Sequence, residues 1–261
     1  MSVVLASAWY PRGEFSRFEQ IMPLLKDVYA GVVISLPPDS DMGLVNKLTT
    51  NLDVSVVVTP DWSWGRYAAL QAALGMPATH VQYVDFDRLL RWVETKTGEW
   101  RHIIELLQNV DCLIVGRTET AYRTHPQALV LTESISNLVT SNFLGRQMDV
   151  SAGCKCFKRE AVEFLLANCE PGFALGTDAE WPIILHRAGF KIEYVSVDGL
   201  DWEIPDQYQK QASGEERQQQ QANLYDANPV NWESRVKVAF EIVQVGLEAS
   251  IRKIGHQNHG N

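Results

Sequence analysis

Short apolar runs alternate with longer amphipathic segments through the first third of the chain. The apolar runs are rich in β-branched residues and hydrophobic at consecutive positions, as in parallel strands covered on both faces. They are Val3–Ser7, Val32–Leu36, Val54–Thr59 and His80–Val84. Between them, apolar residues recur three or four positions apart, which predicts helices over Glu14–Val28, Met42–Thr50 and Trp64–Leu74. This alternation predicts an α/β domain with a Rossmann-like, mostly parallel sheet flanked by helices, which binds ligands at the carboxyl ends of its strands.

The next part of the chain is less regular but continues the same pattern. Helical spacing predicts helices at Glu99–Gln108, Leu129–Asn142, Glu160–Ala167 and Asp178–Ala188. Extended segments are predicted at Cys112–Gly116, Met148–Phe157 and Lys191–Val197. We therefore expect one domain over residues 1–205.

The composition changes after Pro205. Gln207–Asn223 is rich in glutamine and charged residues, and it forms either a solvated helix or a loop. Beyond it, Trp232–Ile254 has the spacing of an amphipathic helix. Its apolar face carries Val236, Ala239, Phe240, Val243, Leu247 and Ile251. We expect residues 206–261 to be a polar linker and a C-terminal helical extension, whose apolar face packs on the domain, in a homo-oligomer or on a membrane surface.

Charge and cysteine content narrow the function classes. The 261 residues hold 23 Lys and Arg against 32 Asp and Glu, a formal net charge of −9. This balance argues against general nucleic-acid binding, which needs a basic surface. The chain has four cysteines without a CxxC pair, no secretory-type start, and no run near the roughly 20 apolar residues that cross a bilayer. We expect a cytoplasmic protein, with peripheral membrane contact through the C-terminal helix as the alternative.

Two carboxylates follow the fourth apolar run directly. Asp85 and Asp87 stand one residue apart at the carboxyl end of His80–Val84. Oxygen ligands of this kind suit Mg²⁺ or Mn²⁺, and the phosphates of a nucleotide diphosphate supply further ligands. A metal held there would offset the charge that develops on a departing diphosphate. The alternative is that Asp87 caps a helix that starts at Arg88.

Aromatic side chains precede a second polar motif. Trp62 and Trp64 come just before Gly65 and Arg66, in the loop after the third apolar run. An indole in that loop suits stacking on a base or a sugar, and packing at a rim is the alternative.

Several of these motifs occur in an order that resembles the inverting family-2 glycosyltransferases of the GT-A fold, especially their dolichyl-phosphate mannosyltransferase-like branch. Asp85-Phe86-Asp87 is similar to the family's Asp-x-Asp, and residues 111–117 resemble its next strand, which ends in Gly and Arg. Residues 149–153 are similar to its Asp-x-x-Ser-Gly segment, and residues 176–180 to its acidic helix. The resemblance runs from residue 1 to about residue 203 and implies a GT-A-type fold.

The resemblance implies a donor site for a UDP- or GDP-sugar. Asp39 and Asp41 match the acidic loop that contacts the nucleoside, although both also suit a helix cap. Arg66 matches the basic residue near the nucleotide, and Asp85 belongs to the same site. Tyr10 stands where the family has a tyrosine before Asn-Glu, but that dipeptide is missing here.

The acidic helix supplies the implied catalytic base. By the resemblance, Asp178 accepts the proton of an acceptor hydroxyl as its oxygen attacks the anomeric carbon, with Glu180 as the second candidate. Both residues also suit a helix N-terminus, where the helix dipole favours anions.

A different acceptor would change which residues matter. If the acceptor is a lipid phosphate, which is already ionised, no base is needed, and Arg117 and Arg146 become phosphate contacts. Ser151 and Gly153, from the Asp-x-x-Ser-Gly segment, are expected on the same acceptor side.

The leading hypothesis is a glycosyltransferase that depends on Mg²⁺ or Mn²⁺ and transfers a hexose, with inversion, from a UDP- or GDP-sugar to an acceptor hydroxyl or a lipid phosphate. A sugar-phosphate nucleotidyltransferase is the second, but the Gly-rich loop it needs after the first strand is reduced to Gly13. The third is an inactive, glycosyltransferase-like binding or scaffold protein.

Overall fold

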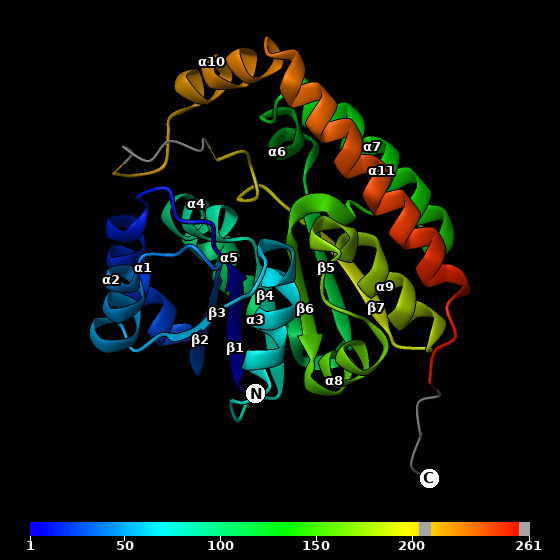
Figure 1. Cartoon of the computed structure of the whole chain (residues 1–261), viewed down its shortest axis with the longest axis horizontal. Helices are drawn as coiled ribbons and strands as arrows, with labels where there is room; N and C mark the ends of the chain where they lie inside the picture. The colour runs from blue at the N-terminus through cyan, green and yellow to red at the C-terminus, as the bar shows by residue number, and fades with distance from the viewer. Residues whose placement is uncertain (204–209, 256–261) are drawn as a thin grey trace.

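A single mixed sheet organises the protein. The computed structural model describes residues 1–203 and 210–255. Its seven strands lie in the order β3-β2-β1-β4-β6-β5-β7 (Figure 1). They are β1 (Val3–Ala8), β2 (Gly31–Leu36), β3 (Ser55–Val58), β4 (His80–Val84), β5 (Cys112–Arg117), β6 (Cys154–Lys158) and β7 (Ile192–Val197). Only β6 runs against its neighbours, since it is antiparallel to both β4 and β5, so the prediction of a mostly parallel sheet is confirmed.

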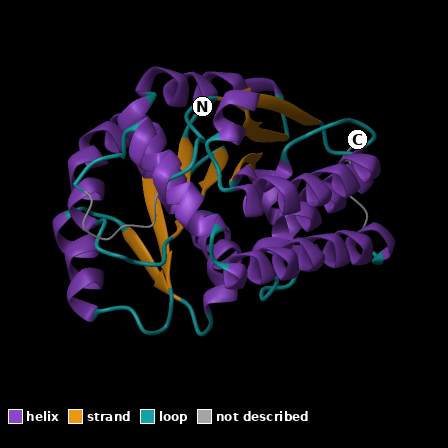
Figure 2. Ribbon diagram, turned by 90° about the horizontal axis from the view of Figure 1, so that it is seen from above, coloured by secondary structure: helices purple, strands orange, loops and turns teal. Residues whose placement is uncertain are grey.

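Helices cover both faces of the sheet (Figure 2). One hydrophobic core joins the sheet to α1 (Phe15–Val28), α4 (Phe86–Thr95) and α5 (Thr97–Glu105). The other core lies under α3 (Gly65–Ala73), α7 (Gln127–Leu144), α8 (Arg159–Asn168), α9 (Thr177–Arg187) and α11 (Pro229–Ile251). The structure also has α10 (Glu215–Asp226) and the shorter elements α2 (Met42–Asn46), the π-helical turn Lys47–Asn51 and α6 (Glu119–Arg123). The buried consecutive runs of the strands therefore have helices on either side, as their sequences predict.

The predicted elements agree with the structure except at a few places. The helix that was expected to start at Arg88 begins earlier, at Phe86, with Asp85 at its N-cap position. The predicted extended segment Met148–Phe157 is extended only at β6, because a helical turn over Val150–Ala152 and the left-handed Gly153 precede the strand. Helix α6 was not predicted.

In the C-terminal helix, the buried face is not the one that the sequence predicts. Helix α11 packs on α9 and α7 through small and branched residues: Ala239, Ile242, Val245, Gly246 and Ala249. Small residues let the backbones of two helices approach closely, and a Cβ atom on Gly246 would lie 3.0 Å from the Cβ atom of Ala179. Most of the face that was expected to be buried is instead exposed, which corrects that prediction: Val236, Phe240, Leu247 and Ile251.

The glutamine-rich segment is helical from Glu215 onward, and its described residues 210–214 are not helical. Helix α10 buries Gln218 and Ala222, while residues 207–209 of the predicted segment lie outside the described residues. Among the described helices, none is both long enough and apolar enough to span a lipid bilayer.

We expect Gly199→Ala to destabilise the fold by about 1–3 kcal/mol, because its Cβ atom would overlap the fully buried ring of Trp92. Gly98→Ala is the matched control. A Cβ atom there meets nothing within 4 Å and lies inside α5, so we expect up to about 1 kcal/mol of stabilisation. Urea unfolding measures both, and equal stability of the two variants would contradict this packing.

Candidate functional site

A cavity opens at the carboxyl ends of β1 to β4. We call it the sheet-edge cavity, and it is lined in part by Ala8, Leu36, Thr59 and Asp85, which follow or end the four strands. Beneath these residues, the ring of Trp9 stacks on Phe86 with centroids 4.1 Å apart. This is the edge of an α/β sheet at which ligands bind.

A second cavity adjoins the first. We call it the helix-side cavity, and it shares Arg66, Asp85 and Asp87 with the sheet-edge cavity. Its far wall comes from α7 and α11, which contribute Glu133 and Arg235. The two cavities therefore meet at the carboxylates that the sequence singles out.

Alternating buried charges lie where the two cavities meet. The Nζ atom of Lys155 lies 2.6 Å from Oδ1 of Asp178, and that oxygen also accepts a 2.8 Å hydrogen bond from Arg66. The guanidinium of Arg66 then donates to Oδ2 of Asp85 at 2.6 Å, and the hydroxyl of Tyr83 donates to Oδ1 of Asp85, also at 2.6 Å. Two cations and two anions thus offset one another in a region where Lys155, Arg66 and Asp178 are buried.

The reversed direction of β6 brings these charges together. Because β6 is antiparallel to β4, its first residues lie beside the last residues of β4, with Lys155 opposite Tyr83. Gly153, just before β6, accepts a 2.8 Å hydrogen bond from the amide of Asp85. Gly153 has a positive φ of 75°, and a Cβ atom there would overlap the Asp85 carboxylate. Glycine is therefore required for Asp85 to occupy its place.

The two carboxylates of the Asp-x-Asp have different environments. Burial raises the pKa of Asp85, and the neighbouring guanidinium of Arg66 acts against that rise. Each oxygen of Asp85 accepts one hydrogen bond, from Arg66 or from Tyr83, and each keeps a further lone pair, so the role of Asp85 as a metal ligand stays a prediction. Asp87 sits in the first turn of α4, and in the described part of the chain its side chain accepts a hydrogen bond only from the amide of Arg88, at 2.9 Å. Among the described residues no ion pair joins Asp87, so its carboxylate is available to a cation.

A metal at Asp87 would have to be held largely by a bound ligand. In the described part of the chain, no group of three or more His, Cys, Asp or Glu side chains could enclose an ion. Mg²⁺ is often bound by one or two carboxylates together with substrate phosphates, and Asp87 at the junction of two open cavities fits that arrangement.

The other predicted donor residues divide into two groups. Tyr10 and Trp62 line the sheet-edge cavity and are mostly exposed, at 58% and 61%. Trp64 does not line that cavity. Asp39 and Asp41 are exposed and do not line it either, and Asp41 caps α2 by accepting the amide of Gly43 at 3.0 Å. The helix-cap alternative therefore applies to Asp41.

The two predicted catalytic carboxylates also separate. Asp178 lines the helix-side cavity, and within the described residues only its Oδ1 atom makes hydrogen bonds. Glu180 has no exposed surface and accepts a 2.6 Å hydrogen bond from Arg252 near the end of α11. Glu180 lies outside both cavities, so its predicted role as a second base does not fit the structure.

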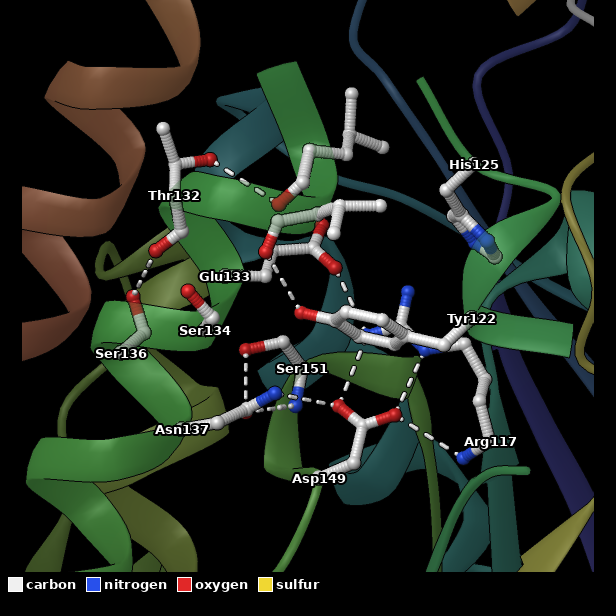
Figure 3. A network of polar contacts seen from close by, with 12 residues as sticks. Arg117, Tyr122, His125, Thr132, Glu133, Ser134, Ser136, Asn137, Asp149 and Ser151 are labelled. Atoms are coloured by element: carbon white, nitrogen blue, oxygen red, sulfur yellow. Dashed lines mark hydrogen bonds and ion pairs between the residues drawn. The ribbon is translucent and has the colours of Figure 1, made fainter. Parts of the chain in front are cut away.

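One of the predicted phosphate contacts, Arg117, belongs to a network that reaches the helix-side cavity through Glu133 and Ser151 (Figure 3). Arg117 is buried and donates to Asp149 at 2.7 Å and 2.8 Å, while its guanidinium also pairs with Glu133 at 2.8 Å. Asn137 links Asp149 to Ser151, which donates to the Asn137 carbonyl oxygen at 3.0 Å. Arg117 is therefore fixed by carboxylates and cannot clamp a phosphate in this arrangement.

The two other residues predicted on the acceptor side, Arg146 and Ser151, lie in different places. Arg146 is half-exposed beside Glu193, at 3.5 Å, and lines neither cavity, so its predicted phosphate contact does not fit. Ser151 does line the helix-side cavity.

Lys155 is the functional candidate that sequence reasoning missed. It stands between Cys154 and Cys156 in β6, and the cysteines attract attention first. The available signal was a charged residue inside an apolar strand, which must be buried with a partner or stay at the rim.

Comparison with known proteins gives similarity only at the level of structure. No protein-family model matches the chain, and no curated protein matches it. Glucosyl-3-phosphoglycerate synthase from Mycobacterium tuberculosis, in complex with Mn²⁺, UDP-glucose and phosphoglyceric acid, superposes with a TM-score of 0.58 at 11% identity, covering 95% of this chain and 79% of that chain. Its complex with Mn²⁺, UDP and phosphoglyceric acid gives 0.55 at 13% identity, covering 99% and 80%. These similarities confirm the predicted GT-A-type fold.

The Arg117–Asp149 pair generates a prediction about acid stability. Burial acts to raise the pKa of Asp149, but Arg117 outweighs it and holds that pKa below its usual value. A folded-state pKa below the unfolded value of about 3.9 contributes stability above that pH, which is lost as the pH falls through the folded-state pKa. We expect Asp149→Asn to cost about 3 kcal/mol at neutral pH and progressively less below about pH 4.

Urea unfolding over this pH range measures the effect. Asp27→Asn is the control, because Asp27 forms an exposed ion pair with Arg101 and should contribute less than about 0.5 kcal/mol. A cost for Asp149→Asn that does not change with pH would contradict the assignment.

Proposed function

We propose that the protein is a glycosyltransferase that takes a hexose from a nucleotide-diphosphate sugar. The observation that carries the proposal is Asp87, a carboxylate without an ion pair among the described residues, at the junction of two open cavities on the carboxyl edge of a GT-A-type sheet. The similar solved structures support it, since they are described with Mn²⁺ and UDP or UDP-glucose.

The nucleotide occupies the sheet-edge cavity in this proposal. Its floor offers the apolar stack of Trp9 on Phe86, and its mouth offers the exposed rings of Tyr10 and Trp62. Aromatic rings of this kind stack on any base, because stacking does not depend on the hydrogen-bonding groups of the base. UDP is the first nucleotide to test, and GDP is the second.

The diphosphate lies over Asp87 and Arg66. When bound, Mg²⁺ or Mn²⁺ held at Asp87 supplies the positive charge that the leaving diphosphate requires. Arg66 and Lys155 both pair with Asp178, and Arg66 also pairs with Asp85, so these four side chains are held at one point. The buried pairs fix these groups before the donor arrives, which is how preorganised charges lower a barrier.

The acceptor occupies the helix-side cavity. Asp178 presents its Oδ2 atom, which makes no hydrogen bond within the described residues, and we propose that this oxygen accepts the proton of an acceptor hydroxyl. In this proposal the acceptor oxygen bonds to the anomeric carbon on the face opposite the departing diphosphate, which inverts the configuration of that carbon. Arg12 and Arg88 line the same cavity, and they are the cations that would hold an anionic acceptor, whether a soluble phosphate ester or the lipid phosphate of the dolichyl-phosphate mannosyltransferase-like branch.

We expect Asp87→Ala to weaken binding of UDP-glucose in the presence of Mn²⁺ by about 10- to 100-fold, because the cation loses its protein ligand. Isothermal titration calorimetry measures this, and chelation of the metal should weaken the wild type to the same extent. Asp27→Ala, at an exposed position outside both cavities, should leave the affinity unchanged. Equal affinity of Asp87→Ala and wild type would contradict the proposed role of Asp87 as a metal ligand.

We expect Trp62→Ala to weaken the same binding by about tenfold, because loss of one stacking ring costs about 1–3 kcal/mol. Trp64→Ala is the matched control, since Trp64 is an exposed indole two residues away that does not line the cavity. If the two variants bind the donor equally well, the nucleoside does not lie at Trp62. Release of UDP on turnover separates an enzyme from a protein that only binds the donor.

A further inference from the structure

Two neighbouring helices expose apolar side chains on the same outer surface. Helices α7 and α11 pack against each other, and both pack on α9, so their remaining faces point away from the domain (Figure 1). They run parallel from a common start, where Asp226 accepts the amides of Gln127 and Ala128 at 2.7 Å and 2.9 Å. Farther along, Arg235 of α11 donates to Glu133 of α7 at 2.7 Å.

The exposed side chains form one stripe on each helix. We call the two stripes together the α7–α11 face, and its seven residues are Leu131, Ile135, Leu138, Val236, Phe240, Leu247 and Ile251. Their spacings of three, four and seven positions keep each set on one side of its helix. Val243 lies between Phe240 and Leu247 in the sequence, and it is half-buried beside the α11 stripe.

The size of this face exceeds what a monomer ordinarily exposes. Each of its seven residues is between 52% and 77% exposed. Together they present on the order of 700 Å² of apolar residue surface, which is above the largest patch of a typical monomer and near the roughly 800 Å² per partner of a standard interface.

We propose that the α7–α11 face is the interface of a homodimer, in which the two helices of one copy pack against the same two helices of a second copy. An interface related by a two-fold axis must be self-complementary, and an apolar face meets that condition because it can pack against itself. The four helices would then bury their stripes as the helices of a bundle do.

The charges around the face favour a second copy over a lipid surface. Helices that lie on membranes carry Lys and Arg beside the apolar stripe, where they meet anionic lipids. Here the exposed Lys237 is paired with Glu233 at 2.7 Å, Glu248 is acidic, and the chain carries a net charge of −9. The inference stands apart from the proposed function, since none of the seven residues lines either cavity.

Sedimentation velocity of the full chain tests the proposal. We expect the wild type at micromolar concentration to sediment at twice the 29.4 kDa mass of the chain. Leu138→Glu and Phe240→Glu should each raise the dissociation constant of the dimer at least 100-fold, because each puts two charges into the interface, one from each copy.

Leu224→Glu on α10 is the matched control, since Leu224 and Leu138 are both 58% exposed but Leu224 lies outside the face. It should leave the dimer intact. Far-ultraviolet circular dichroism confirms that each variant is folded, which is expected because every change is at an exposed position. A monomeric wild type, a dimer that survives both substitutions, or a monomer that floats with phosphatidylcholine and phosphatidylserine vesicles would overturn the proposal.

Discussion

The pairing of Lys155, Asp178, Arg66 and Asp85 is the interaction on which the rest of the site depends. Each of these groups would be costly to bury alone, and the alternation of charge makes their burial tolerable. The pairing ties α3, α9 and the ends of β4 and β6 to one point, because one charged residue comes from each of these elements or follows it directly. Removal of Asp178 would leave Lys155 buried without a carboxylate partner among the described residues.

That pairing includes Asp85 but not Asp87, so the two carboxylates have different surroundings. Asp85 accepts hydrogen bonds from Arg66 and Tyr83, and its negative charge offsets part of the buried positive charge. Asp87 lies two residues further on, in the first turn of α4, and lines both cavities. Two carboxylates that look equivalent in the sequence thus have different surroundings, because Asp85 is paired with Arg66, whereas no ion pair joins Asp87 among the described residues.

The strands and most helices were predictable because their patterns are local. His80–Val84 coincides with β4 to the residue, and the consecutive apolar residues of the other parallel strands place them within a residue or two. The direction of β6 was not predictable, since pairing depends on long-range contacts that leave no periodic mark in the sequence. For that reason Lys155 was missed, although Gly153, two residues before it, was predicted as a site residue from the family resemblance.

Only part of the site was predictable, because the sequence does not show which distant residues pair with one another. Asp85 and Asp87 were predicted because they follow a strand, where an α/β sheet places its ligands, and Arg66 and Asp178 were predicted from the family resemblance; all four line the two cavities. Arg117 and Glu180 were assigned wrongly because a charged side chain in a motif does not reveal whether a distant residue already pairs with it. Their partners, Asp149 and Arg252, come 32 and 72 positions later in the chain.

The place of β6 in the sheet also bears on the order in which the chain folds. In space β6 lies between β4 and β5, but along the chain it comes after both. Strands β1 to β4 can pair with one another from residues 3–84 alone, whereas β5 has no neighbour until β6 arrives some 40 positions later. During synthesis the open edge of β4 therefore waits for residues 154–158, and a nascent chain paused before them exposes unpaired backbone groups to other chains.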